Sequence, residues 1–181
     1  MEFIEIKEPR HPLAENMETL YLEAFPEEER KPIVDLYRHQ HSGHSKVFAI
    51  KDHALPFIGM VVVIYDDNVM VIEYLATVSS VRGKNYGSKI LRKLMDIYID
   101  KHIVLEIEET KVPSLESELR MRRRKFYERN QFNFYDQTIS YFGVPLELMG
   151  TCDNIKYEDY IQPYKLTYGL DASKDIFELA D

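Results

Sequence analysis

The residues best suited to chemistry gather in the stretch TVSSVRGKNYGSKILRKL, where a β-branched run gives way to a helical pattern. Arg82, Gly83, Lys84 and Gly87 stand at this boundary. The first turn of a helix leaves backbone N–H groups unpaired at the positive end of the helix dipole, which favours an anion there. The stretch therefore predicts an anion site; the alternative is an ordinary helix start with solvated charges, because short glycine patterns recur by chance.

Composition limits the ligand. The chain has 181 residues, is 45% hydrophobic and 12% aromatic, and carries a net charge of −8. These values predict one globular domain over residues 1–181, and they argue against nucleic acid or a membrane surface as the main partner. Basic residues cluster in the stretch above and in the block Arg120–Lys125. An acidic chain with local basic patches suits a small anionic ligand better than a polyanion.

Other residue types indicate a cytoplasmic protein without a metal. The one cysteine, Cys152, cannot form an internal disulfide and is expected to be a half-buried small residue. The N-terminal stretch lacks a signal-peptide pattern, and the longest apolar run, Gly59–Tyr65, is too short to span a bilayer. The spacing of His39, His41 and His44 fits no standard ligand set, so a loop is the better interpretation.

Periodicity predicts an alternation of strands and helices. Expected strands are Phe3–Lys7, Lys46–Lys51, Pro56–Tyr65, Val69–Val78, His102–Glu109, Phe132–Phe142 and Tyr160–Gly169. Expected helices are Leu13–Ala24, Lys31–Gln40, Asn85–Asp100 and Leu115–Asn130, with a loop at Thr110–Ser114. Pro145–Asn154 is compatible with a strand or a loop. This order predicts an α/β (α+β) fold with a mixed sheet and a parallel crossover in its middle.

Two motifs in this order resemble the GNAT superfamily of N-acyltransferases. The family's acyl-CoA signature has Gln or Arg, two residues, Gly, one residue, then Gly or Ala; here Arg82, Asn85 and Gly87 fill those places. Asn85 departs from the pattern, but Asn is the next-best residue after Gly for a positive φ. In the second motif a Tyr is followed five residues later by a Phe, as at Tyr127 and Phe132.

The second motif also departs from the family pattern at two places, where Gln131 replaces the usual Gly and Arg120 the usual Asn. The resemblance covers roughly Phe3 to Phe142. It implies a mostly antiparallel sheet with a central, splayed parallel strand pair and helices on both faces.

The resemblance implies acetyl-CoA as the cosubstrate. Leu75, Ala76 and Thr77 would pair with the pantetheine arm as a missing strand does. The pyrophosphate would bind to the amides of Gly83, Lys84, Asn85, Tyr86, Gly87 and Ser88. Arg82 adds charge there, and Arg123, one turn before Tyr127, could meet the phosphates or a substrate carboxylate.

Acyl transfer to an amine needs a base, directly or through water, and a proton donor for the thiolate. By the resemblance Tyr127 is that donor; the alternative is a core aromatic residue. Glu73 interrupts an apolar strand, where a carboxylate is costly unless it is paired or functional, so it is the candidate base. A partly exposed strand residue is an equally good interpretation of Glu73. Glu106 and Glu108 share one face of the next strand and could attract a cationic amine.

The leading hypothesis is an N-acetyltransferase that moves an acetyl group from acetyl-CoA to a small-molecule or peptide amine by direct attack. A noncatalytic acyl-CoA-binding module is the alternative, because Asn85 and Gln131 depart from the family pattern. Nucleic-acid binding through Arg120–Lys125 is the third and poorest hypothesis. A monomer and a homodimer both remain open.

Overall fold

The computed structural model describes residues 1–111 and 115–179, so Val112–Ser114 of the predicted loop and the last two residues lie outside the described part. The strands are β1 (Glu2–Glu5), β2 (Ser45–Asp52), β3 (Leu55–Tyr65), β4 (Val69–Thr77), β5 (His102–Glu108), β6 (Asn133–Tyr141), β7 (Val144–Gly150) and β8 (Ile176–Glu178). The α-helices are α1 (Ala14–Ala24), α2 (Ile33–His39), α3 (Tyr86–Ile97), α4 (Ser117–Arg129), α5 (Tyr157–Tyr160) and α6 (Gln162–Tyr168). Short 3-10 turns occur at Glu27–Glu29, Gln40–Ser42, Ser79–Val81 and Ala172–Asp175.

All the described strands belong to one sheet in the order β1-β2-β3-β4-β5-β7-β6-β8. Neighbouring strands are antiparallel except β4 and β5, which are parallel. The crossover between them is α3, as a parallel pair requires. This α+β architecture confirms the predicted fold class.

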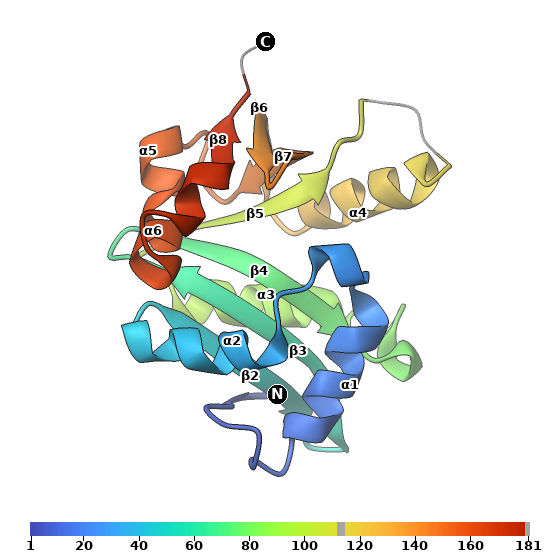
Figure 1. The fold of residues 1–181 in the computed structure, drawn as a ribbon. Coiled ribbons are helices and arrows are strands. Elements are labelled where there is room, and N and C mark those ends of the chain that lie inside the picture. The colour runs from blue at the N-terminus through green and yellow to red at the C-terminus, as the bar shows by residue number, and fades with distance from the viewer. Residues whose placement is uncertain (112–114, 180–181) are drawn as a thin grey trace.

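Helices cover both faces of the sheet, as Figure 1 shows. Side-chain alternation along β3 separates the faces. Val61 and Val63 join a core with α3 and with α4, whereas Met60 and Val62 face α1 and α2. Ile64 continues the second face and packs with α5 and α6. The sheet therefore has α3 and α4 on one side and α1, α2, α5 and α6 on the other.

The C-terminal part corrects one prediction and decides another. Tyr160–Gly169, predicted as a strand, instead forms the end of α5 and all of α6. Pro163 stands in the first turn of α6, where proline is tolerated. The ambiguous stretch Pro145–Asn154 contributes most of β7, which pairs with β5 and β6. The tail therefore extends the sheet and places two short helices against its second face.

Candidate active site

The two parallel strands separate in the middle of the sheet. They pair only at Val69–His102, Met70–Ile103 and Val71–Val104, although both strands continue further. Beyond this point the edge of β4 that faces β5, including Leu75, Ala76 and Thr77, has no strand partner among the described residues. We call the gap beyond Val71 and Val104 the β4–β5 opening. It matches the splayed strand pair that the family resemblance implied.

A β-bulge places Glu73 at the start of this opening. On β3, Val63 pairs with Ile72 and Val62 with Tyr74, so Glu73 is the extra residue of β4. A bulge re-aims side chains, and the side chains of Glu73 and Tyr74 both turn toward the second face of the sheet. The one-residue irregularity thus brings a carboxylate into an otherwise apolar strand.

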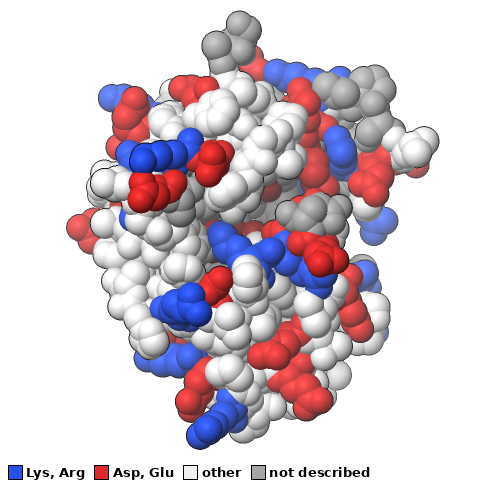
Figure 2. Space-filling view, in the orientation of Figure 1, with Lys and Arg blue, Asp and Glu red and all other residues white. Residues whose placement is uncertain are grey.

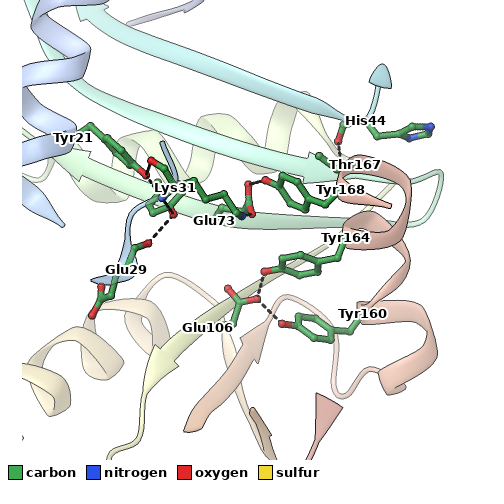
Figure 3. Close-up of polar contacts among 11 residues, drawn as sticks. Tyr21, Glu29, Lys31, His44, Glu73, Glu106, Tyr160, Tyr164, Thr167 and Tyr168 are labelled. Carbon is green, nitrogen blue, oxygen red and sulfur yellow. Dashed lines mark hydrogen bonds and ion pairs between the residues drawn. The ribbon is translucent and has the colours of Figure 1, made fainter. Parts of the chain in front are cut away.

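The Glu73 carboxylate is buried and paired. Its side chain is 3% exposed; Oε1 accepts a hydrogen bond in an ion pair with the Lys31 ammonium, and Oε2 accepts one from the Tyr168 hydroxyl. Figure 3 shows Lys31 and Tyr168 reaching Glu73 from different parts of the chain. Burial lowers the pKa of Lys31, but the Glu73 carboxylate, and after it the Tyr141 hydroxyl, outweigh burial, so the pKa is raised overall. The Glu73 side chain therefore has little access to solvent, which argues against its interpretation as a strand residue that reaches solvent.

Glu106 lies across the opening on β5. Its Oε1 accepts hydrogen bonds from Tyr160 at 2.7 Å and Tyr164 at 2.6 Å (Figure 3). Burial raises the pKa of this carboxyl, and the two hydroxyl donors lower it by less. Glu106 is therefore easier to protonate than an ordinary surface carboxylate.

Both carboxylates are held by one row of side chains that the sequence analysis missed. Tyr160, Tyr164 and Tyr168, the tyrosine row, stand four residues apart, and successive ring centroids are 5.6 and 6.2 Å apart. Positions i, i+4 and i+8 share one helical face. This spacing was the available signal, but the surrounding β-branched and aromatic residues also suit a strand.

Tyr127 is partly buried in the core beneath the sheet. Its ring packs against Phe126 and Phe132, with centroids 5.2 and 5.7 Å away. Burial raises the pKa of Tyr127 to about 12, the Arg123 charge lowers it, and the Glu108 and Glu106 charges add to the rise. Tyr127 is therefore a protonated hydroxyl at neutral pH, and its pKa responds to the charges of Glu106 and Glu108.

Arg123 and Glu108, which the sequence analysis assigned to different ligands, form an ion pair with each other. Their side chains are 43% and 21% exposed. The pair joins α4 to the end of β5 beside the opening. Either residue can bind a ligand only in exchange for, or in addition to, this contact.

The N-terminus of α3 has the backbone geometry that an anion site requires. Gly83 and Asn85 have φ angles of 74° and 64°, so the two positions adopt the left-handed conformation that glycine and asparagine tolerate best. The amides of Tyr86, Gly87 and Ser88 have no acceptor among the described residues. Gln131 also has a positive φ, of 69°. Both residues that replace a glycine of the family pattern, Asn85 and Gln131, thus keep a positive φ.

Two contacts tie this helix start to its surroundings. The Arg82 Nε donates a hydrogen bond to the Thr77 carbonyl at 3.2 Å, which connects the loop to the end of β4. A Cβ built on Gly87 would lie 3.0 Å from Cζ of Phe126. Gly87 thus permits close packing of α3 on α4 as well as access to its amide. Lys84 is exposed beside it.

The histidines and the cysteine that the sequence singled out make contacts within the fold. Within the described residues no group of three or more His, Cys, Asp or Glu side chains could hold a metal ion. The His39 ring packs against Tyr168, and the His44 ring bonds to the Tyr65 carbonyl. Cys152 is partly buried and bonds to the Tyr135 hydroxyl at 2.9 Å. None of the described helices has the length and apolar character of a membrane span.

Comparison with known proteins places this geometry in a class. Residues 14–132 match the model of the acetyltransferase (GNAT) family. A putative GNAT-family acetyltransferase from Bacteroides thetaiotaomicron has a similar structure, with TM-score 0.77 and 26% identity over 94% of this chain and 99% of that one. No curated protein matches the chain.

Two more distant structures share the fold. An aminoglycoside 6'-N-acetyltransferase complexed with coenzyme A has a TM-score of 0.65 at 17% identity, covering 86% of this chain and 99% of that one. A GNAT acetyltransferase from Elizabethkingia anophelis with acetyl-CoA bound has a TM-score of 0.56 at 14% identity, covering 82% and 95%. The splayed parallel pair and the open helix start are thus found in a chain with an acetyltransferase fold. Because the family model spans more than half of it, this chain belongs to the acetyltransferase (GNAT) family.

Proposed function

We propose that this protein is an N-acetyltransferase, acting as a single domain over residues 1–181, that moves the acetyl group of acetyl-CoA to a primary amine of a small molecule or peptide. One observation carries the proposal. An amide-rich helix start and two carboxylates, the buried Glu73 and the partly buried Glu106, approach the β4–β5 opening from opposite faces of the sheet. The thioester and the amine can therefore meet in the opening without sharing one entrance.

The first face suits the cosubstrate. The free amides of Tyr86, Gly87 and Ser88 would bind a pyrophosphate, with Arg82 and Lys84 adding positive charge. The Lys84 amide, predicted to join them, instead donates to the Val81 carbonyl at 3.2 Å. The unpaired edge at Leu75, Ala76 and Thr77 would bind the pantetheine amides. Arg123 would add a phosphate contact if it exchanged its Glu108 partner. The two distant relatives that hold coenzyme A or acetyl-CoA support this assignment.

The second face suits the amine. Glu106 would attract its ammonium form and accept its proton, because burial already raises the pKa of this carboxyl toward the range in which a base works. Glu73 remains the other candidate base, but Lys31 and Tyr168 now occupy its two oxygens. Glu108 lies further out on the same strand and would steer a cation inward. The acceptor end of the site is thus negative and partly aromatic.

Transfer needs no covalent enzyme intermediate. The amine nitrogen attacks the thioester carbonyl, the new C–N bond forms, and the C–S bond breaks as the thiolate leaves. Tyr127 would supply the proton that the thiolate takes up, because a hydroxyl with a pKa of about 12 is protonated at neutral pH. The proton lost from the attacking nitrogen passes to Glu106, and exchange with solvent then returns Glu106 and Tyr127 to their starting protonation states.

The noncatalytic alternative loses its main support. It was based on Asn85 and Gln131, and both hold a positive φ, the conformation that glycine accommodates most easily.

Charged side chains of both signs are interspersed over the face drawn in Figure 2, which favours a small ligand over a polyanion.

An amine panel tests the proposal. Acetyl-CoA is incubated with simple alkylamines, amino acids, aminoglycosides and lysine peptides, and both free thiol and acetylated product are measured. Amine-dependent thiol release with matching product supports the proposal. Binding of acetyl-CoA without turnover across the panel would favour the noncatalytic module instead.

A further inference from the structure

The Lys31 side chain has an environment that is unusual for an internal ion pair. Its Nζ bonds to Glu73 and lies 4.0 Å from the ring centroid of Tyr168. The rings of Tyr141 and Tyr164 are each 5.9 Å from the same nitrogen. One carboxylate and three aromatic rings thus surround an alkylammonium group. We call Glu73, Tyr141, Tyr164 and Tyr168 the ammonium cage.

Recognition of organic cations uses these same groups. An aromatic face attracts a cation through its quadrupole, most strongly when the cation is desolvated. A charge-assisted hydrogen bond to a carboxylate adds direction and strength. The two contacts together suit a primary ammonium on an unbranched chain, because such a group is narrow and carries three donors.

The backbone of Lys31 is fixed, whereas its side chain is only partly enclosed. Its amide donates to the Tyr21 hydroxyl at 2.9 Å and lies 3.3 Å from the Tyr74 hydroxyl, and its carbonyl accepts from Tyr21. The side chain nevertheless remains 20% exposed. Rotation of the four-carbon chain would therefore empty the cage without moving α1 or α2. Figure 3 shows this chain extending toward the carboxylate from its anchored end.

The cage also stands where an acceptor must bind. Glu73 lies two positions after Val71, the last residue of β4 that pairs with β5, and Glu106 lies two positions after its partner Val104 on β5. Tyr164 belongs to both arrangements, because its ring lies near Lys31 and its hydroxyl bonds to Glu106. The ammonium of Lys31 is therefore held at the mouth of the opening, on the amine side.

We propose that Lys31 is an internal occupant of the acceptor site and that the substrate is a primary alkylammonium, on an unbranched chain, that displaces it. The inference rests on the proposed function for the identity of the site. Until it is displaced, Lys31 occupies Oε1 of Glu73, the oxygen that Tyr168 leaves open, and competes with every amine. A purely structural ion pair predicts the opposite, namely that no amine replaces Lys31.

The test measures binding without acetyl-CoA, so it does not depend on turnover. The probe is n-butylammonium, which has the four carbons of a lysine side chain, and n-butanol is the neutral control. Titration calorimetry compares the wild type with Lys31→Met, which keeps a similar volume but removes the charge. Lys46→Met is the matched control, because Lys46 also pairs with a carboxylate, Glu5, and lies over an aromatic ring.

We expect Lys31→Met to bind n-butylammonium about tenfold more tightly than the wild type or more, since an occupant present nine-tenths of the time raises the apparent Kd by that factor. Lys46→Met should match the wild type, n-butanol should not bind, and the double variant Lys31→Met/Glu73→Gln should lose the gain. In the wild type, saturating n-butylammonium should shift the Lys31 Cε–Hε NMR signal to the position of exposed lysines.

Equal affinities in the wild type and in Lys31→Met, or an unmoved Lys31 signal at saturation, would overturn the proposal. If Lys31→Met does not fold, the NMR signal of the wild type alone decides. Turnover gives a separate readout, in which kcat/KM for n-butylamine should rise in Lys31→Met. Absence of turnover in every protein, with displacement observed, would refute the proposed transferase and leave the cation site standing.

Discussion

Substitutions of Glu106 test the proposed acceptor site most sharply, because two of them separate its role as a hydrogen-bond acceptor from its charge. Its Oε1 accepts hydrogen bonds from Tyr160 and Tyr164, which are 0% and 2% exposed. Glu106→Gln keeps an oxygen acceptor for both hydroxyls and removes the charge. Glu106→Leu removes the acceptor as well.

The expected stabilities differ by several kcal/mol. Each buried hydroxyl left without a partner costs about 1–3 kcal/mol, so Glu106→Leu should destabilise the fold by roughly 2–6 kcal/mol. Glu106→Gln loses only the charge assistance of two bonds and escapes the burial of a charge, so its change should stay within about 1 kcal/mol. Urea unfolding followed by circular dichroism measures both.

The pH dependence adds a second readout. Burial raises the pKa of Glu106, so the folded state holds this proton more tightly than the unfolded chain. Wild-type stability should therefore fall as pH rises from the ordinary carboxyl range through the raised pKa, and Glu106→Gln should lack this contribution. If Glu106 accepts the amine's proton, the wild-type rate should rise over the same range.

Both variants should lose about 10²-fold or more in turnover, the usual contribution of a positioned base, while acetyl-CoA binding stays near the wild-type value. Equal destabilisation by Gln and Leu would refute the hydrogen-bond reasoning. Wild-type turnover in Glu106→Gln would remove Glu106 from the chemistry and return Glu73 to first place.

Three further predictions follow from named contacts. Tyr127→Phe keeps the packing against Phe126 and Phe132, so stability should hardly change while turnover drops about 10²-fold. In the wild type, the rate should show no loss from deprotonation of Tyr127 at pH values below its pKa of about 12. Gly87→Val should lower the free energy of unfolding in urea by about 1–3 kcal/mol, because the new side chain clashes with Phe126. It should also abolish the rise in melting temperature that acetyl-CoA causes, and a rise of wild-type size would exclude the helix start as the anion site. Asn85→Gly should be tolerated in both measurements, whereas Asn85→Val should destabilise by about 1–2 kcal/mol because its φ is 64°, and equal stabilities would contradict the assigned backbone role.

Local patterns predicted most of the sheet and the helix start at Arg82–Ser88. Strand alternation and the apolar stripe of α3 are short-range signals, so β2 to β5 and α3 occur close to their expected ranges. The positive φ of Asn85 also followed from its residue type. The sequence thus predicted the backbone geometry of this helix start, whereas binding of the cosubstrate there stays a prediction.

Glu73 and Glu106 were predicted as candidates, but the contacts that hold them could not be predicted because they join distant parts of the chain. Glu73 meets Lys31 from 42 residues away and Tyr168 from 95, and no periodicity encodes either pair. The bulge that turns Glu73 inward is equally invisible locally. The helices that carry the tyrosine row were missed for another reason. Tyrosine favours strands, and this preference outweighed the four-residue spacing. Packing on the sheet, rather than local propensity, determined α6.

The central claim is that an acetyl group passes directly from acetyl-CoA to an amine in the β4–β5 opening. A single-turnover reaction with carbonyl-13C acetyl-CoA and excess n-butylamine tests it most directly, with protein mass and small-molecule products measured at successive times. The account predicts that the label appears in the amide as thiol is released, while the protein mass stays unchanged throughout. An acetylated protein that precedes the amide, or bound acetyl-CoA that never transfers its label, would contradict it.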